Sequence, residues 1–266
     1  GQVRDRLFEL AGVQRHHLVL DVHAGTGLLT WEAVRQAPEG GVWALTSNQQ
    51  AGEALRQQAE RLPEMERPFI LIGSLDELAY LMALRGDEDV RFDRVLARNL
   101  FTQDASGVAE MGGLVKEWLG ENGRFCLAQT IPQHGQRLYN LIDWQEIPTA
   151  VYDKVRAVEE AIYSDPDSSM TNWDESRLEA GLRSAGFARV QVQLQPESQQ
   201  RRITEAHLQR WFGEADEYAA QPSYAQRLRT AGITENDVNK LATLYRKQLQ
   251  DQVVSWYVTT AYLIAA

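Results

Sequence analysis

The residues best suited to chemistry lie in a short glycine-rich loop near the amino terminus. Asp21 stands four residues before Gly25-Thr26-Gly27, and glycines in such a loop let the backbone adopt positive φ and approach a ligand closely. A helix that begins directly after Gly27 would point its free N–H groups and the positive end of its dipole at the loop. That arrangement binds carboxylates and phosphates. A G-x-G sequence alone is more often a simple tight turn than a ligand site, so the surrounding elements must decide between the two.

A regular alternation of strands and helices would position this loop. We expect strands at residues 17–22, 42–46, 69–72, 92–97 and 124–128, and helices over 4–12, 28–38, 48–62, 76–84 and 106–119. Strands that alternate with helices of this length indicate βαβ units and a parallel sheet. Strands that are apolar on both faces indicate that helices cover both sides. In such a sheet a ligand binds beyond the carboxyl ends of the strands, where the glycine-rich loop is expected.

The second half of the chain has a different pattern. Residues 135–163 and 203–250 are expected to be largely helical, and a helix capped by Thr171 or Asn172 should end at Gly186. Residues 190–194 alternate between polar and apolar, and residues 253–264 are rich in β-branched and aromatic types. Both patterns predict strands.

Composition narrows the classes of function. Apolar residues make up 44% of the chain, enough for a packed core. No apolar run approaches the roughly eighteen residues of a membrane helix, and no signal peptide is evident. The net charge of −10 argues against direct nucleic-acid binding. Cys126 is the only cysteine, so an internal disulfide and a cysteine-based zinc site are excluded.

From these features we assign no metal ligands and no membrane partner, and we expect a cytoplasmic protein. Cys126 falls in the middle of a predicted strand, where it should be buried and chemically inert. The chain starts at Gly1, which fits either the remnant of a tag or an excised piece of a longer protein.

Four landmarks, in the same order, resemble those of class I S-adenosylmethionine-dependent methyltransferases. They are Leu18-Val19-Leu20-Asp21 with Ala24-Gly25-Thr26-Gly27, Phe92-Asp93-Arg94-Val95-Leu96, Glu121-Asn122-Gly123-Arg124-Phe125, and Leu182-Arg183-Ser184-Ala185-Gly186-Phe187. They resemble the first motif, the fourth strand, the turn into the fifth strand, and the turn before the terminal hairpin. The resemblance implies a doubly wound α/β fold, with a mostly parallel seven-stranded sheet and a terminal antiparallel hairpin. It implies one domain over 1–266, with helical insertions at 131–170 and 195–250.

The resemblance also implies a cofactor, S-adenosylmethionine, and transfer of its methyl group to an acceptor that the sequence does not identify. The loop after strand one would hold the amino-acid end, and residues after strands two and three would lie near the ribose and the adenine. The implied cofactor-binding residues are Asp21, His23, Ala24, Gly25, Thr26, Gly27, Thr46, Ser47, Ser74 and Leu75. The implied catalytic residues, after strand four, are Asn99 and Arg98.

Each of these catalytic candidates has a structural alternative. Asn99 could cap the following segment, Arg98 could be a solvated surface charge, and His23 could be a loop residue bonded to backbone. Three positions also depart from the family pattern. His23 replaces the first glycine of the loop, Thr46 replaces the usual ribose-binding carboxylate, and Ser74 replaces an Asp that often contacts the adenine.

These departures bear on cofactor affinity. A carboxylate accepts hydroxyl protons in charge-assisted bonds that a neutral side chain does not copy, and each loss would cost about 1–3 kcal/mol. Ser47, Asn48 or Asp76 could compensate. The alternative function is therefore an interaction or regulatory module with weakened or lost cofactor binding. A nicotinamide-dependent enzyme is disfavoured because Thr30 stands where the dinucleotide fingerprint has its third glycine.

The whole chain is also similar to the methyltransferase-like C-terminal region of bacterial fusion proteins. In those proteins a AAA+ ATPase of the replication-associated recombination type comes first. This similarity implies an ATPase domain in cis as the partner, with DNA nearby but not bound directly by this chain.

Overall fold

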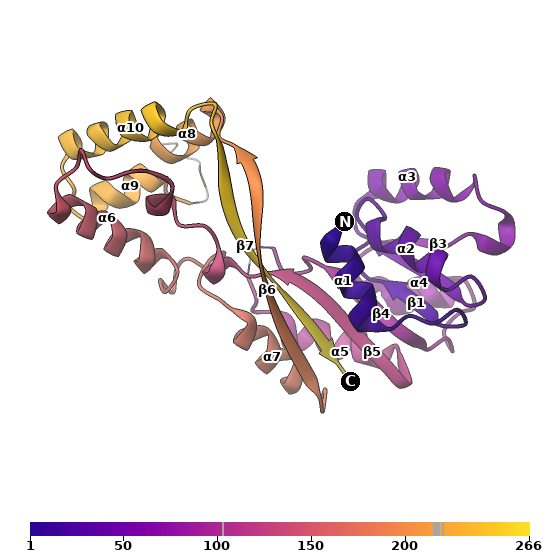
Figure 1. Cartoon of the computed structure of the whole chain (residues 1–266). Coiled ribbons are helices and arrows are strands. Elements are labelled where there is room, and N and C mark those ends of the chain that lie inside the picture. The colour runs from indigo at the N-terminus through magenta and orange to yellow at the C-terminus, as the bar shows by residue number, and fades with distance from the viewer. Residues whose placement is uncertain (103, 215–218, 220) are drawn as a thin grey trace. The chain divides into compact units, whose positions relative to one another are not determined.

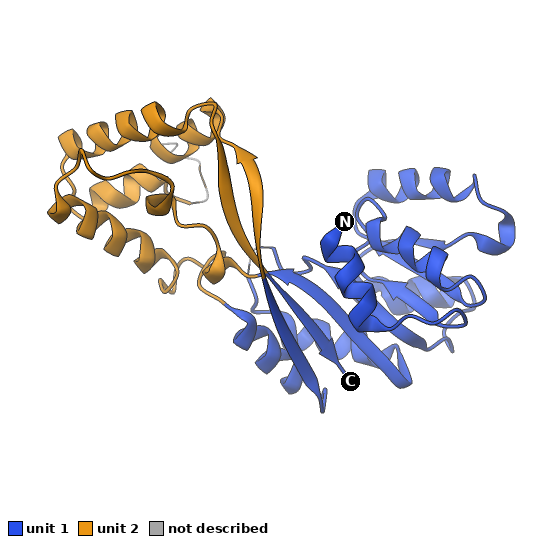
Figure 2. Ribbon diagram, viewed as in Figure 1, with its two compact units in different colours: residues 1–130, 174–195, 260–266 blue, residues 131–173, 196–259 orange. Residues whose placement is uncertain are grey.

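The computed structural model describes residues 1–102, 104–214, 219 and 221–266. The chain divides into two compact units (Figure 2). Unit 1 consists of residues 1–130, 174–195 and 260–266, and unit 2 of residues 131–173 and 196–259. Unit 2 nearly coincides with the two segments that we expected to be insertions. That residues 1–266 act as one domain stays a prediction.

One seven-stranded sheet runs through the molecule in the order β3-β2-β1-β4-β5-β7-β6. The strands are β1 (Leu18–Asp21), β2 (Gly41–Thr46), β3 (Phe69–Ile72), β4 (Phe92–Arg98), β5 (Leu119–Thr130), β6 (Val190–Arg202) and β7 (Val253–Ala265). Neighbours from β3 to β5 are parallel, and β7 is antiparallel to β5. The predicted doubly wound sheet with its terminal hairpin is confirmed (Figure 1). The strand order reverses between β1 and β4, which is the switch point where ligands bind in open α/β sheets.

The helices of unit 1 match the predicted alternation. They are α1 (Gln2–Ala11), α2 (Leu28–Gln36), α3 (Gln49–Ala59), α4 (Leu78–Leu84), α5 (Val108–Glu117) and α7 (Glu175–Ser184), with short 3-10 turns at Glu64–Glu66 and Leu75–Glu77. The cap of α7 differs from the prediction. Asp174 Oδ1 accepts from the backbone N–H groups of Ser176 and Arg177, whereas Thr171 and Asn172 donate to backbone carbonyls.

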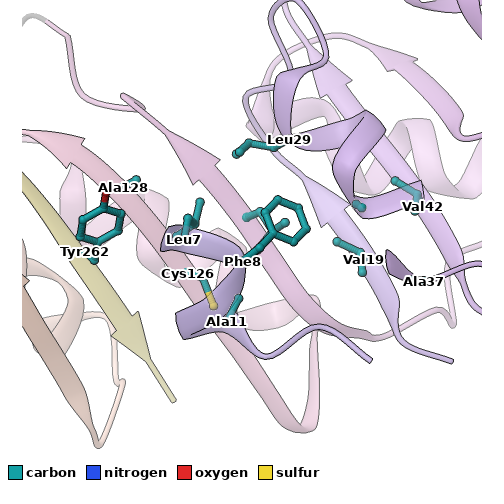
Figure 3. Close-up of a cluster of buried hydrophobic side chains, with 12 residues drawn as sticks. Leu7, Phe8, Ala11, Val19, Leu29, Ala37, Val42, Cys126, Ala128 and Tyr262 are labelled. Atoms are coloured by element: carbon teal, nitrogen blue, oxygen red, sulfur yellow. The ribbon is translucent and has the colours of Figure 1, made fainter. Parts of the chain in front are cut away.

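The core of unit 1 lies between the sheet and its covering helices. Leu7 and Phe8 of α1 pack with Val19, Cys126 and Tyr262 of three different strands (Figure 3). The alternate residues of the same strands point to the other face of the sheet, where α5 packs against α7. Cys126 is fully buried as predicted, and burial raises the pKa of its thiol to about 12.

Unit 2 is mostly helical, and contains the adjoining parts of β6 and β7. Its helices are α6 (Thr149–Ile162), α8 (Glu205–Phe212), α9 (Tyr224–Thr230) and α10 (Glu235–Leu249). They enclose an aromatic-rich core that includes Trp211, Tyr224 and Tyr245. The prediction for 203–250 is confirmed over its described residues. No helix in the part of the chain that the structure describes is long and apolar enough to cross a membrane.

The prediction that residues 135–163 are largely helical holds for the second half of the segment and is wrong for the first half. Only α6 forms a regular helix there, and Pro148 occupies its N-cap. Before it lie 3-10 turns at Pro132–His134 and Leu138–Leu141. The physical reason is Glu159, whose buried carboxylate accepts from the backbone N–H groups of Leu138 and Tyr139. These groups are therefore satisfied outside a helix.

Candidate functional site

The glycine-rich loop is held at the switch point by backbone hydrogen bonds to both neighbouring strands. Val22 N donates to Leu96 O of β4 at 3.0 Å, and Ala24 N donates to Leu45 O of β2 at 3.0 Å. Gly25 and Gly27 have φ of +50° and +85°, a region that favours glycine. The helix α2 begins directly after Gly27, as predicted.

The two glycines serve different purposes. A Cβ on Gly27 would lie 2.5 Å from Leu55 Cδ2 and 2.5 Å from Trp31 Nε1, so Gly27 is needed for helix packing. A Cβ on Gly25 would have His23 O, at 4.0 Å, as its nearest neighbour. Open space therefore lies over Gly25. Since Gly27 is the N-cap and has no side chain, no capping side chain bonds the start of α2. The N–H groups of Leu28 and Leu29 are left for a ligand, whereas that of Thr30 bonds Asp21.

Asp21 has a loop-holding role. Its side chain is fully buried, and Oδ2 accepts from Thr30 Oγ1 at 2.8 Å while Oδ1 accepts from His23 N at 3.2 Å. Burial raises the pKa of this carboxyl to about 6, against the opposing effect of the Thr30 and His23 hydrogen bonds. Asp21 thus ties the loop to the first turn of α2. Its direct contact with a cofactor stays a prediction.

The carboxyl end of β2 has no carboxylate at the predicted ribose position. Thr46 is buried, and its Oγ1 accepts from Asn48 N at 3.3 Å. The Asn48 side chain caps α3 by accepting from Ala51 N at 2.9 Å, so its carbonyl oxygen is already engaged. Ser47 is exposed at this end.

The carboxyl end of β3 presents a carboxylate that our sequence reasoning missed. Ser74 N donates to Glu77 Oε2 at 2.8 Å and Ser74 Oγ donates to the same atom at 3.2 Å. The two residues form a capping box around the 3-10 turn that begins at Leu75, and Asp76 is exposed within it. The S-x-x-E spacing is the known signal of this motif. A negative charge therefore stands beside Ser74, where the family pattern has an Asp.

The segment after β4 is fastened to the end of β5. Asn99 has φ of +48°, its N–H donates to Ala128 O at 2.9 Å, and its Oδ1 accepts from Thr130 N at 2.9 Å. Gln129 is buried. Its side-chain oxygen accepts from Phe101 N and its side-chain nitrogen donates to Phe101 O. The oxygen of Asn99 is thus used structurally. No local sequence signal identifies Gln129, because its partner lies 28 residues away.

Two predicted residues meet across the switch point. His23 is exposed, and its Nδ1 lies 2.8 Å from the carbonyl oxygen of Arg98, which is half-buried. Thr26 is exposed at the loop tip, and Ala24 is buried beneath it. Within residues 1–102, 104–214, 219 and 221–266, no group of three or more His, Cys, Asp or Glu side chains could hold a metal ion.

The sheet order, its reversal between β1 and β4, and the glycine-rich loop at that point together define the class I methyltransferase fold. Comparison with solved structures agrees. A candidate methyltransferase from Bacillus halodurans C-125 is 15% identical, with a TM-score of 0.53 over 100% of this chain and 98% of that chain. The YcgJ protein of Bacillus subtilis is 14% identical, with a TM-score of 0.54 over 99% and 97% of the two chains.

A third structure of this fold contains a ligand. The mycolic acid cyclopropane synthase CmaA1, complexed with S-adenosylhomocysteine and CTAB, is 12% identical, with a TM-score of 0.51 over 99% of this chain and 82% of that chain. At these identities the likeness establishes the fold alone. No family model matches the sequence, and no curated protein matches it.

Proposed function

We propose that this chain transfers the methyl group of S-adenosylmethionine to an acceptor at the carboxyl edge of β1 and β4. The observation that carries the proposal is the open space over Gly25, beside the first N–H groups of α2. A carboxylate fits this position, because helix N-termini attract negative charge. The S-adenosylhomocysteine complex of CmaA1, which has the same fold, also supports the proposal.

The chain's own residues would do little covalent work in this reaction. When bound, S-adenosylmethionine supplies an activated methyl group on a sulfonium, so the protein must mainly orient the acceptor. The backbone around Gly25 and the start of α2 would hold the amino-acid end. Glu77, beside Ser74, would supply the negative charge at the end of β3.

Calorimetric titration with S-adenosylhomocysteine tests the proposal, and the chain offers a matched pair of variants. Gly25 and Gly12 both have positive φ, +50° and +59°, and an added Cβ would meet nothing closer than 4.0 Å at either. Gly12 is the C-cap of α1 and takes no part in the loop. We expect Gly25→Ala to weaken binding by about tenfold or more, a loss of about 1.4 kcal/mol, and Gly12→Ala to leave it unchanged. Absence of binding to the unmodified protein at about 1 mM, a free energy of about −4 kcal/mol, would refute the proposal.

A second candidate function has one specific observation in its favour. Thr46 is buried without a carboxylate nearby on β2, and Asn48 is engaged as a helix cap. A methyltransferase-like interaction or regulatory module would explain these facts, and the same titration would then show no binding. The AAA+ ATPase as partner in cis stays a prediction. A nicotinamide enzyme is less favoured, and absence of a thermal shift with NAD would remove it.

A further inference from the structure

His23 makes one hydrogen bond through its backbone and one through its imidazole ring. Its backbone N–H donates to Asp21 Oδ1 at 3.2 Å, and its ring Nδ1 lies 2.8 Å from Arg98 O. A carbonyl oxygen only accepts, so Nδ1 must carry the hydrogen. In the neutral ring the second nitrogen, Nε2, is then unprotonated and has a free lone pair.

Two carboxylates at this edge of the sheet, those of Asp21 and Glu77, already accept hydrogen bonds. Both oxygens of Asp21 accept hydrogen bonds and its side chain is fully buried. Glu77 accepts twice from Ser74. The Oδ1 atom of Asn99 accepts from Thr130 N. The exposed ring of His23 is different, because its fixed bond to Arg98 leaves Nε2 free to accept a proton.

We propose that His23 is the proton acceptor of the methyl-transfer site, and that the acceptor substrate is a hydroxyl compound. The inference rests on the proposed function. A neutral hydroxyl is a weak nucleophile that must lose its proton, and a base within hydrogen-bond reach provides for this. The hydroxyl oxygen forms a bond to the methyl carbon, the electrons of the carbon–sulfur bond stay on sulfur, and the hydroxyl proton moves to Nε2. The imidazolium then releases that proton to water. The products are a methyl ether and S-adenosylhomocysteine.

The same geometry gives the departure at position 23 a chemical purpose. With a glycine at position 23, as in the family pattern, the Arg98 carbonyl would lose its imidazole partner. The carboxyl edge of the sheet would also lose the lone pair of Nε2. The bond to Arg98 also joins the loop after β1 to the last residue of β4, and these are the two strands at which the sheet order reverses. The imidazole is therefore bonded to a rigid strand of the sheet, which fixes its orientation.

The tautomer of His23 is measurable without any substrate. Long-range proton–nitrogen NMR on histidine-labelled protein should show a protonated Nδ1 and an unprotonated Nε2 for His23, with the signal assigned by its loss in His23→Gln. His17 and His207 are internal controls of the opposite kind. Their Nδ1 atoms accept from the backbone N–H groups of Gln14 and Thr204, so the hydrogen must sit on Nε2. A His23 spectrum like that of His17 would overturn the proposal.

A second measurement tests the position of His23 relative to the cofactor. Saturating S-adenosylhomocysteine should shift the Nε2 resonance of His23, while diethylpyrocarbonate should still modify His23 at a rate close to that of the free protein. His16, which is exposed, controls for the reagent. Complete protection would make His23 a cofactor contact, and no shift would place it away from the cofactor. Either result overturns the proposal. If calorimetry detects no S-adenosylhomocysteine binding, the proposed function fails instead, and the tautomer of the free protein remains a separate result.

Discussion

Replacing Gly27 with alanine should destabilise the protein substantially more than the same replacement at Gly12. Both glycines have positive φ, +85° and +59°, so each alanine would cost about 1–2 kcal/mol in the left-handed region. Both replacements also lower the conformational entropy of the unfolded chain, which stabilises the folded protein by about 0.4–1 kcal/mol. The effect on the unfolded chain is common to both variants and cancels in the comparison. The backbone strain is at least as large at Gly27, whose φ of +85° and ψ of 13° lie farther from the ideal left-handed α values than those of Gly12.

The difference comes from packing. The Cβ added at Gly27 would lie 2.5 Å from both Leu55 Cδ2 and Trp31 Nε1, whereas the Cβ added at Gly12 would meet no atom within 4 Å. Leu55 is 1% exposed and lies in a cluster with Ala24 and Ala44, so it has little room to withdraw. Overpacking of this kind costs about 1–3 kcal/mol. We therefore expect Gly27→Ala to be about 1–3 kcal/mol less stable than Gly12→Ala.

Urea unfolding, followed by far-UV circular dichroism, measures this difference. The two variants should share one denaturant slope and differ in midpoint, because the same surface is exposed on unfolding. Equal midpoints would refute the reasoning, since they would show that α3 moves away from the loop at no cost. A changed slope would instead report altered compactness of the folded or unfolded state.

Three further predictions concern buried groups. Burial raises the pKa of Asp21 to about 6 and that of Glu159 to about 7. Each unfolded carboxyl therefore loses its proton first, and stability falls as pH rises from about 4 through each folded pKa. Urea titrations at several pH values should show a smaller decrease in the free energy of unfolding with pH for Asp21→Asn and for Glu159→Gln. The decrease removed by Asp21→Asn should be about 3 kcal/mol. If either variant kept the pH dependence of the unmodified protein's stability, the raised pKa of that carboxyl would be contradicted. Gln129→Leu should cost about 2–4 kcal/mol by leaving the backbone of Phe101 unpaired, with faster amide exchange at Phe101, and retained protection there would count against it. Cys126 should react with a thiol reagent only in denaturant, because burial raises its pKa to about 12. Reaction in buffer would show that β5 opens.

The parts of the fold that could be predicted from sequence are those specified by local patterns. The strand before Asp21 and the helix after Gly27 follow from an apolar run and a glycine turn, and both are present. The helix over 135–148 failed because Glu159 satisfies the backbone of that segment from a later position in the chain. Local helix propensity does not register such a distant partner.

The site shows the same division. The loop conformation of positions 21 to 27 was predictable because turn chemistry is local, whereas its cofactor-binding role stays a prediction. Glu77 could have been found from its S-x-x-E spacing with Ser74. The roles of Asn99 and Gln129 were not predictable, since each depends on a partner brought close by the pairing of β4 with β5. The cap of α7 was ambiguous for another reason. Thr171, Asn172 and Asp174 are all good capping types, and only the structure distinguishes them.

The three departures from the family pattern differ in their physical consequence. At position 74 we expect Glu77, which lies within hydrogen-bond distance of Ser74, to offset the missing carboxylate. At position 23 the lost glycine is replaced by an imidazole bonded to the Arg98 carbonyl. We therefore expect the uncompensated loss to lie at Thr46, at the end of β2. One lost charge-assisted bond costs about 1–3 kcal/mol, or roughly ten- to a hundredfold in affinity. A loss of that size weakens a cofactor site without abolishing it, so under the proposed function we expect a working methyltransferase with reduced ribose recognition rather than a module that has lost its cofactor.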